Sequence, residues 1–236
     1  MSTPSNIPVT LISGFLGAGK TTLLRHFLSQ QPTHENWGLL INEFGQVGID
    51  ADLLPDASHI VQIAGGCICC TTAPLLRVNL NRLIQKKPDR IIIELSGLGH
   101  PAGVIHLLNT YQQTVRLAGI LGMVDLALLN NPRYAAHPLF QEQLSLAHVL
   151  MGSKADQLSE TEAWQRLSNV QKELGLDNAA LTLIRHGKAD LCWLDGAINS
   201  ANSSLFRVSS KARAYSLVSP MQQFNISEWE VRLQQG

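Results

Sequence analysis

Gly14-Phe15-Leu16-Gly17-Ala18-Gly19-Lys20-Thr21 is the stretch that decides the fold, because it matches the phosphate-binding pattern G-x-x-x-x-G-K-S/T. An apolar, β-branched run over residues 9–13 comes before it, and residues 22–29 after it have apolar side chains at helical spacing. The pattern therefore stands between a buried strand and a helix, which is the local structure that it requires.

The residues of this stretch are suited to binding a phosphate chain. Glycines allow backbone N–H groups to curl around phosphate oxygens without a clash from a Cβ atom, and the start of the helix adds a positive dipole end. We expect Lys20 to reach the β- and γ-phosphates and the Thr21 hydroxyl to bind Mg²⁺. The predicted nucleotide-binding residues here are Gly14, Gly17, Ala18, Gly19, Lys20, Thr21 and Thr22.

The bulk composition is that of an ordinary globular chain and argues against several classes of partner. The 236 residues are 45% hydrophobic and carry no formal net charge, so no overall field draws the chain to nucleic acid or to an anionic membrane. The longest apolar stretch, residues 117–129, contains Asp125 and is too short to span a bilayer. No basic region precedes the first apolar stretch. We expect a cytoplasmic protein that binds neither nucleic acid nor membrane.

Strand and helix patterns alternate along the chain, which predicts an α/β fold of the P-loop NTPase type, a mostly parallel sheet with helices on both faces. Beyond the first strand and helix, we expect strands at residues 37–41, 58–63, 90–95, 118–125, 148–152 and 180–184. Helices are expected at 75–85, 103–109, 139–147 and 160–174. The predicted regions are a P-loop domain over 1–190, a Ser/Asn-rich linker over 191–213, and the first strand and partial helix of an incomplete C-terminal domain over 214–236.

A carboxylate and a glycine follow the most strand-like run of the chain. Glu94 is expected at the C-terminal end of a strand beside the phosphate loop, where Mg²⁺ needs a second anchor, direct or through water. Gly97 can offer a backbone N–H to the γ-phosphate and so sense hydrolysis. We therefore predict Lys20, Thr21 and Glu94 as catalytic residues. The alternative is that Glu94 and Gly97 belong to an ordinary strand-to-helix turn.

The pattern N/S-K-x-D occurs as Ser153-Lys154-Ala155-Asp156, directly after a short predicted strand. In guanine-binding proteins this Asp accepts hydrogen bonds from guanine N1–H and the exocyclic amino group, which adenine cannot supply, and the Lys stem packs over the base. A similar segment, Lys188-Ala189-Asp190, follows the next strand. We prefer the first segment as the guanine site, and we expect His186 and Gly187 to pack backbone against the base.

Three of the four cysteines, Cys67, Cys69 and Cys70, fall within four residues. Neighbours this close would form strained disulfides, whereas three thiolates in one turn can hold three corners of a tetrahedral Zn²⁺ site. An open fourth position suits a metal that is carried and released, and Glu43, His100 or a partner protein are the candidates for it. Buried structural cysteines are the alternative. Thiolates also bind Co²⁺ and Ni²⁺, so the ligand types leave the metal open.

Taken together, these motifs resemble the CobW-like family of metallochaperone GTPases. The segments that carry the resemblance are residues 14–22, 42–45, 65–70, 94–98 and 153–156, and residues 184–190 and 215–229 are similar to its zinc-binding YeiR-like branch. The resemblance implies a slow GTPase that converts GTP to GDP with Mg²⁺. It also implies Zn²⁺ or a similar divalent ion bound through the cysteine cluster, delivery of that metal to a client metalloprotein, and a possible dimer that depends on metal or nucleotide.

Two other functions are compatible with the motifs. A small-molecule or nucleotide kinase would use Lys20 and Thr21 in the same way, but it needs an acceptor pocket and a lid with arginines, and the sequence has no arginine cluster. A non-enzymatic thiol metal buffer would depend on the cysteines alone. Substituting Lys20 separates the buffer from the GTPase, because only the GTPase needs a bound nucleotide.

Overall fold

Seven strands form one sheet in the part of the chain that the computed structural model describes, residues 6–41, 59–62 and 73–196. All neighbouring strands are parallel, and their order is β3-β2-β4-β1-β5-β6-β7. The strands are β1 (Ile7–Gly14), β2 (Trp37–Ile41), β3 (His59–Gln62), β4 (Arg90–Glu94), β5 (Val115–Asp125), β6 (Val149–Ser153) and β7 (Ala180–Leu183). The predicted α/β fold with a parallel sheet is confirmed, and each strand lies close to its expected residues.

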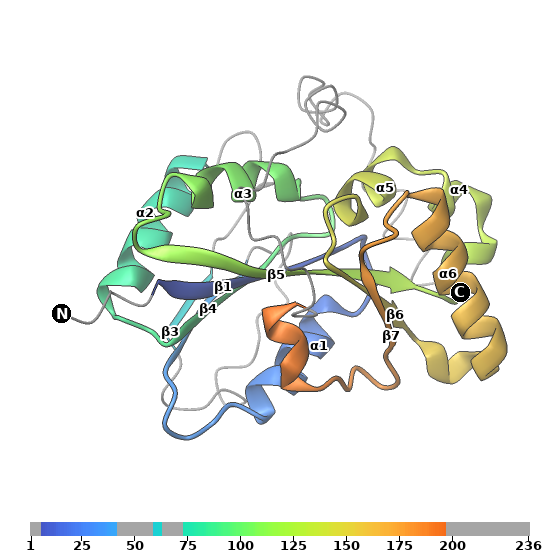
Figure 1. Ribbon diagram of the computed structural model, residues 1–236, viewed down its shortest axis with the longest axis horizontal. Helices are drawn as coiled ribbons and strands as arrows, with labels where there is room; N and C mark the ends of the chain where they lie inside the picture. Colours follow the sequence, from blue (N-terminus) through green and yellow to red (C-terminus); the bar gives the residue numbers. More distant parts are fainter. Residues whose placement is uncertain (1–5, 42–58, 63–72, 197–236) are drawn as a thin grey trace. The chain divides into compact units, whose positions relative to one another are not determined.

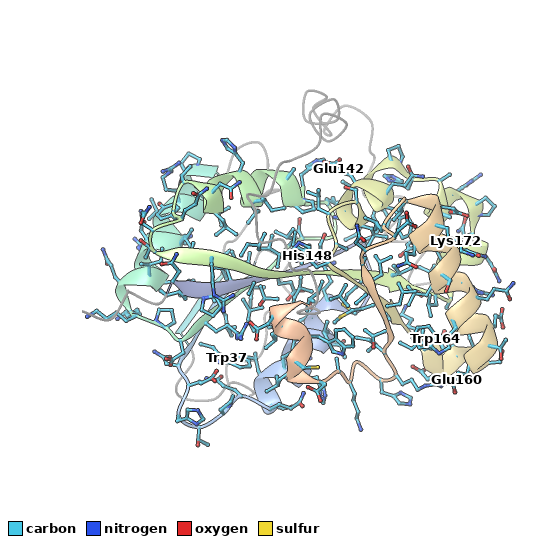
Figure 2. The ribbon with its side chains drawn as sticks, viewed as in Figure 1. Trp37, Glu142, His148, Glu160, Trp164 and Lys172 are labelled. Atoms are coloured by element: carbon cyan, nitrogen blue, oxygen red, sulfur yellow. The ribbon has the colours of Figure 1, made fainter. Side chains whose placement is uncertain are left out.

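Helices cover both faces of this sheet (Figure 1). The α-helices are α1 (Lys20–Ser29), α2 (Ala73–Gln85), α3 (Pro101–Asn109), α4 (Pro132–Ala135), α5 (Pro138–Leu144) and α6 (Glu160–Glu173). The described residues also form the short 3₁₀ helices η2 (Leu128–Asn130), η3 (Ala155–Gln157) and η4 (Leu191–Asp195). Glu160 and Lys172 mark the two ends of α6 (Figure 2), with signs that complement the helix dipole.

The strands read as continuous apolar runs because both faces of the sheet are buried. In β1, Val9 and Leu11 pack in a cluster with α2 and α3, whereas Ile12 packs in a second cluster with α1 and η4. All three side chains are fully buried, and burying an aliphatic side chain of this size contributes roughly 1.5–3 kcal/mol. A third cluster lies between the sheet and α4, α5 and α6. The two-sided packing holds β1, and with it the phosphate loop, at the centre of the sheet.

Three neighbouring strands, β4, β2 and β3, end in one row with Ile12 of β1, and β1 continues to Gly14. Ile12 of β1 pairs with Glu94 of β4, Glu94 pairs with Ile41 of β2, and Ile41 pairs with Gln62 of β3. The segments that follow these strands therefore leave the sheet at the same edge, the carboxyl edge at which parallel α/β sheets bind ligands. This row positions the candidate site described below.

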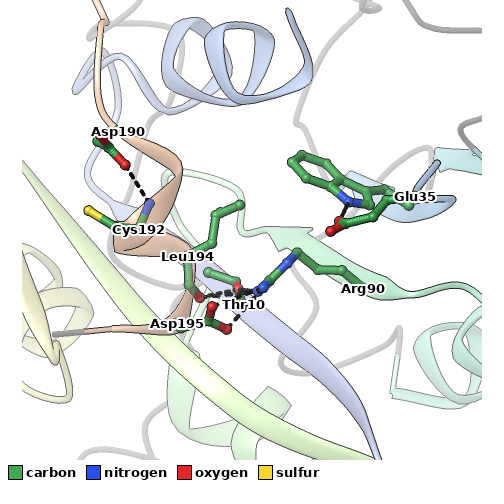
Figure 3. A network of polar contacts seen from close by, with 8 residues as sticks. Thr10, Glu35, Arg90, Asp190, Cys192, Leu194 and Asp195 are labelled. Atoms are coloured by element: carbon green, nitrogen blue, oxygen red, sulfur yellow. Dashed lines mark hydrogen bonds and ion pairs between the residues drawn. The ribbon is translucent and has the colours of Figure 1, made fainter. Parts of the chain in front are cut away.

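Residues 191–196 pack on the sheet, although we expect a linker from residue 191. Leu194 of η4 is 1% exposed, and its backbone carbonyl accepts a 2.6 Å hydrogen bond from the Thr10 hydroxyl. Arg90 binds both carboxylate oxygens of Asp195, at 2.9 and 3.1 Å (Figure 3). The partners of these residues are distant in sequence, so no local pattern of the segment indicates the contact. The rest of the expected linker and the expected C-terminal region lie outside the described residues.

We expect Arg90→Ala to lower the free energy of unfolding by about 2 kcal/mol. The substitution removes the bidentate partner of the Asp195 carboxylate, which is partly buried. In a domain of this size the melting temperature should fall by roughly 5 °C. Thermal unfolding followed by circular dichroism measures the change. Arg116→Ala, at an exposed position of β5, is the matched control. Equal melting temperatures for the two variants would show that the contact between η4 and the sheet contributes no stability.

Candidate nucleotide-binding site

The phosphate loop surrounds a pocket of about 300 Å³ at the carboxyl edge of the sheet. Gly17 and Gly19 have φ values of 74° and 89°, a left-handed conformation that favours glycine. Gly19 begins α1 without a side-chain cap, so the first-turn N–H groups remain available to an anion. The pocket is lined by Leu16, Gly17, Gly19, Lys20, Thr21, Thr22, Glu94, Leu95, Ser96 and Gly97.

Lys20 is held inside this loop. Its side chain is 8% exposed, and Nζ donates hydrogen bonds to the carbonyl oxygens of Gly14, at 2.9 Å, and Phe15, at 3.2 Å. These acceptors keep the buried ammonium group hydrogen-bonded next to the pocket. The loop thus presents a fixed positive charge where the motif places phosphate.

Thr21 and Glu94 meet at the same pocket. The Thr21 hydroxyl donates a 2.7 Å hydrogen bond to Glu94 Oε1, and Glu94 is 2% exposed. A hydroxyl and a carboxylate are the hard oxygen donors that Mg²⁺ prefers. The residues therefore fit the ion that a triphosphate site uses, and the carboxylate comes from the strand end predicted for it.

Gly97 lies directly against the phosphate loop. A Cβ atom at this position would lie 2.8 Å from the backbone nitrogen of Leu16 and 2.5 Å from its side chain, so only glycine fits this approach. The loop after β4 is thereby brought to the pocket, as the sequence predicts. Whether the Gly97 N–H contacts a γ-phosphate stays a prediction.

The predicted base-binding residues form a second polar group. Asp156 Oδ1 accepts a hydrogen bond from the His186 backbone N–H at 3.2 Å, and this bond lowers the pKa of the Asp156 carboxyl. The carboxylate is thus ionised at neutral pH and partly exposed. His186 has a φ of 52°, in the left-handed region.

A close contact between Gly187 and Thr22 joins the base-binding group to the phosphate pocket. A Cβ atom on Gly187 would lie 2.5 Å from the Thr22 side chain, so the 186–187 loop packs closely on the start of α1. The path from the pocket runs through Thr22, Gly187 and His186 to Asp156. The rival Asp190 has a different environment, because its carboxylate accepts the Cys192 N–H at 2.8 Å and caps η4.

Asp125 is a component of the base-binding group that the sequence does not reveal. It is fully buried at the end of β5, and its Oδ2 lies 2.6 Å from Lys154 Nζ. Its Oδ1 accepts hydrogen bonds from the N–H groups of Ala127 and Leu128. Lys154 has a φ of 56°, so a buried carboxylate fixes a lysine held in an unusual conformation.

Ser153, predicted to bind nucleotide, is engaged with the backbone. It is 4% exposed, and its hydroxyl donates to the Val124 carbonyl at 3.1 Å. This bond ties the end of β6 to β5, directly before Lys154. A contact between Ser153 and a nucleotide stays a prediction.

The predicted metal ligands Glu43, Cys67, Cys69 and Cys70 lie outside the described residues. Of the candidate fourth ligands, only His100 is described, and its Nδ1 lies 2.5 Å from Glu142 Oε1 of α5. Over residues 6–41, 59–62 and 73–196, no three His, Cys, Asp or Glu side chains gather as a metal site would need. The described cysteine, Cys192, is free and exposed.

Two further observations concern the kinase alternative and membrane-spanning helices. The described residues that line the phosphate pocket include no arginine. No helix in the described ranges has both the length and the apolar character needed to cross a bilayer.

A phosphate loop, an oxygen pair suited to Mg²⁺ and a strand-end aspartate joined to them define a P-loop nucleotide-binding domain of the α/β class. Comparison with known proteins agrees with this class. The nucleotide-binding domain of the CobW/HypB/UreG family matches residues 8–181. The chain therefore belongs to the CobW/HypB/UreG family, as the motifs indicate.

Individual relatives share most of this chain. The zinc chaperone YeiR of Escherichia coli (strain K12) is 40% identical over 189 residues, which cover 78% of this chain and 57% of YeiR. The zinc chaperone CobW of a Sinorhizobium species is 34% identical over 182 residues, 64% of this chain and 51% of that protein. The crystal structure of Zn(II)-bound YjiA GTPase from E. coli has a TM-score of 0.57 and 27% identity, and covers 81% of this chain and 62% of that chain. This chain spans less than two thirds of the length of these relatives.

Proposed function

We propose that this chain binds and hydrolyses GTP, and that its nucleotide state controls the affinity of a thiolate site for Zn²⁺ that is then delivered to a client metalloprotein. The observation that carries the GTP part is the continuous path from Lys20, Thr21 and Glu94 through Thr22 and Gly187 to Asp156. The names of the relatives, zinc chaperones and a GTPase, support the metal and hydrolysis parts.

Hydrolysis in this proposal depends on positioning and charge. Lys20 places an ammonium group beside the phosphates, and Thr21 and Glu94 provide the oxygen ligands for Mg²⁺. When bound, Mg²⁺ supplies positive charge to the β- and γ-phosphate oxygens. No described side chain at the pocket is an evident general base, which is consistent with slow turnover carried by electrostatic stabilisation.

Base selection depends on Asp156. An ionised carboxylate can accept hydrogen bonds from both guanine N1–H and the exocyclic amino group. Adenine has an acceptor at N1 and no amino group at C2, so it does not offer this pair of donors. The His186 N–H fixes the orientation of the carboxylate before a base arrives. A carboxylate left unsatisfied by adenine supplies the discrimination.

The coupling to metal is proposed from the strands that lead into the ligands. β2 ends at Ile41, next to Glu94, and β3 ends at Gln62, next to Ile41. Strands lie about 4.8 Å apart, so β3 ends roughly 14 Å from β1. Cys67 is five residues beyond Gln62, and an extended segment of that length spans up to roughly 17 Å. The chain is thus long enough for the thiolates to respond to the state of the phosphate site.

A metal titration tests this proposal. We expect the Zn²⁺ affinity to differ at least about tenfold between the protein with a non-hydrolysable GTP analogue and the protein with GDP, a coupling free energy of about 1.4 kcal/mol. Cys69→Ser should abolish tight binding in both states, and Cys192→Ser, at an exposed cysteine, should leave both affinities unchanged. Equal Zn²⁺ affinities in the two nucleotide states would overturn the coupling.

A further inference from the structure

Gln143 of α5 is a fully buried polar side chain that no motif of the sequence marks. Its amide nitrogen Nε2 donates to the carbonyl oxygens of Gly97, at 2.8 Å, and Gly99, at 3.1 Å, and the carbonyl of Ser96 lies at 3.3 Å. One side chain therefore gathers three carbonyls of the loop that follows β4. That is the loop with Gly97 against the phosphate-binding backbone.

The same residue is tied to the start of the phosphate loop. Ser13, which directly precedes Gly14, is fully buried, and its hydroxyl donates a 2.9 Å hydrogen bond to the backbone carbonyl of Gln143. The side-chain amide of Gln143 thus contacts the loop that follows β4, and its backbone carbonyl contacts the residue that precedes the phosphate loop. A γ-phosphate is expected to lie between these two loops.

The neighbouring residue reinforces this attachment. Glu142 Oε1 lies 2.5 Å from His100 Nδ1, and both side chains are largely buried. Figure 2 shows Glu142 on the same side of the molecule as α3, the helix that begins directly after His100. Consecutive residues of α5 therefore hold both ends of the segment from Ser96 to His100.

Packing alone does not explain a glutamine at this position. Among the described residues, Gln143 Oε1 has no hydrogen-bond partner, and an unsatisfied buried acceptor is unfavourable. Neighbouring positions of α5 are filled by Leu139, Phe140 and Leu144, which pack in the core, so an aliphatic side chain is the natural choice for packing alone. What glutamine adds is the pair of N–H donors directed at the loop.

We propose that Gln143 is a positioning residue that holds the Ser96–Gly99 segment where the Gly97 N–H can meet the γ-phosphate, and that it thereby sets the preference for GTP over GDP. This inference rests on the proposed GTP function. Gln143 acts through the loop, since it is absent from the pocket lining. It affects the nucleotide only where a γ-phosphate is present.

The test compares Gln143→Met, which keeps the length of the side chain but removes its donors, with Gln141→Met at an exposed position of the same helix. Calorimetry measures the affinities for GDP and for a non-hydrolysable GTP analogue, and phosphate release measures kcat. For Gln143→Met we expect an unchanged GDP affinity, and both the analogue-to-GDP affinity ratio and kcat about tenfold lower. Gln141→Met should match the unsubstituted protein. An unchanged ratio in a folded Gln143→Met variant would overturn the inference.

A second variant keeps the inference testable if Gln143→Met does not fold. Gln143→Glu has the same shape, and its carboxylate regains a donor only when it is protonated. The analogue-to-GDP ratio of this variant should rise as the pH falls, while that of the unsubstituted protein stays level. A ratio independent of pH in Gln143→Glu counts against the role of the donors. If the unsubstituted chain binds no guanine nucleotide, the proposed function fails instead, which is a distinct result.

Discussion

Lys20→Met is expected to reduce GTP hydrolysis at least about a hundredfold and to weaken GTP binding. Lys20 is 8% exposed, and its ammonium group is held beside the pocket by the carbonyls of Gly14 and Phe15. Methionine has a similar length but no charge, so the negative charge that develops in the transition state loses its fixed counter-charge. Loss of one such preorganised group raises the barrier by roughly 3–4 kcal/mol, which corresponds to a hundredfold or more.

Phosphate release at saturating GTP and nucleotide affinity by calorimetry measure this effect. Lys172→Met is the matched control, because Lys172 is exposed in the last turn of α6 (Figure 2). The variant also separates the GTPase from a thiol metal buffer. In the GTPase, Lys20→Met removes the nucleotide effect on Zn²⁺ binding, whereas a buffer has no such effect to lose. Turnover within about threefold of the unsubstituted chain would show that Lys20 does not stabilise the transition state.

The phosphate half of the site could be predicted because its information is local. One continuous stretch supplies the loop, the lysine and the threonine, and the flanking apolar periodicity fixes the strand and helix around it. Glu94 could be predicted from topology, since the end of a strand beside the phosphate loop is a ligand-binding position of a parallel sheet. The structure brings Thr21 to Glu94 across 73 residues of chain, as the topology requires.

The rest of the site could not be predicted because it consists of side-chain contacts between distant elements. Gln143 reaches Gly97 over 46 residues, and neither residue alone carries a pattern that indicates the pair. The ion pair between the partly exposed Lys154 and the buried Asp125 depends on the register of β5 and β6, which the sequence does not give. The packing of Leu194 on Thr10, 184 residues away, likewise follows from the assembled sheet. The position of the cysteine cluster stays a prediction.

Asp156→Asn is expected to lower the affinity for GTP and to reverse the base preference of the site. In the proposed site, guanine presents two donors, N1–H and the exocyclic amino group, to the Asp156 carboxylate, and an asparagine can accept only one of them. Each hydrogen bond to a charged group contributes about 1.5–3 kcal/mol, so GTP affinity should fall roughly a hundredfold. Xanthine has a carbonyl where guanine has its amino group, and the asparagine N–H can donate to it. The variant should therefore bind xanthosine triphosphate more tightly than GTP.

Competition between the two nucleotides for the variant and for the unsubstituted chain measures this reversal. Asp190→Asn is the matched control and also tests the rival segment directly. Asp190 caps η4 by accepting the Cys192 N–H, and asparagine caps a helix about as well as aspartate, so the fold should be retained. If Asp190→Asn changed the base preference and Asp156→Asn did not, the guanine site would belong to residues 188–190. Because the His186 N–H keeps the pKa of Asp156 below its ordinary value, the preference of the unsubstituted chain for GTP should be constant across neutral pH.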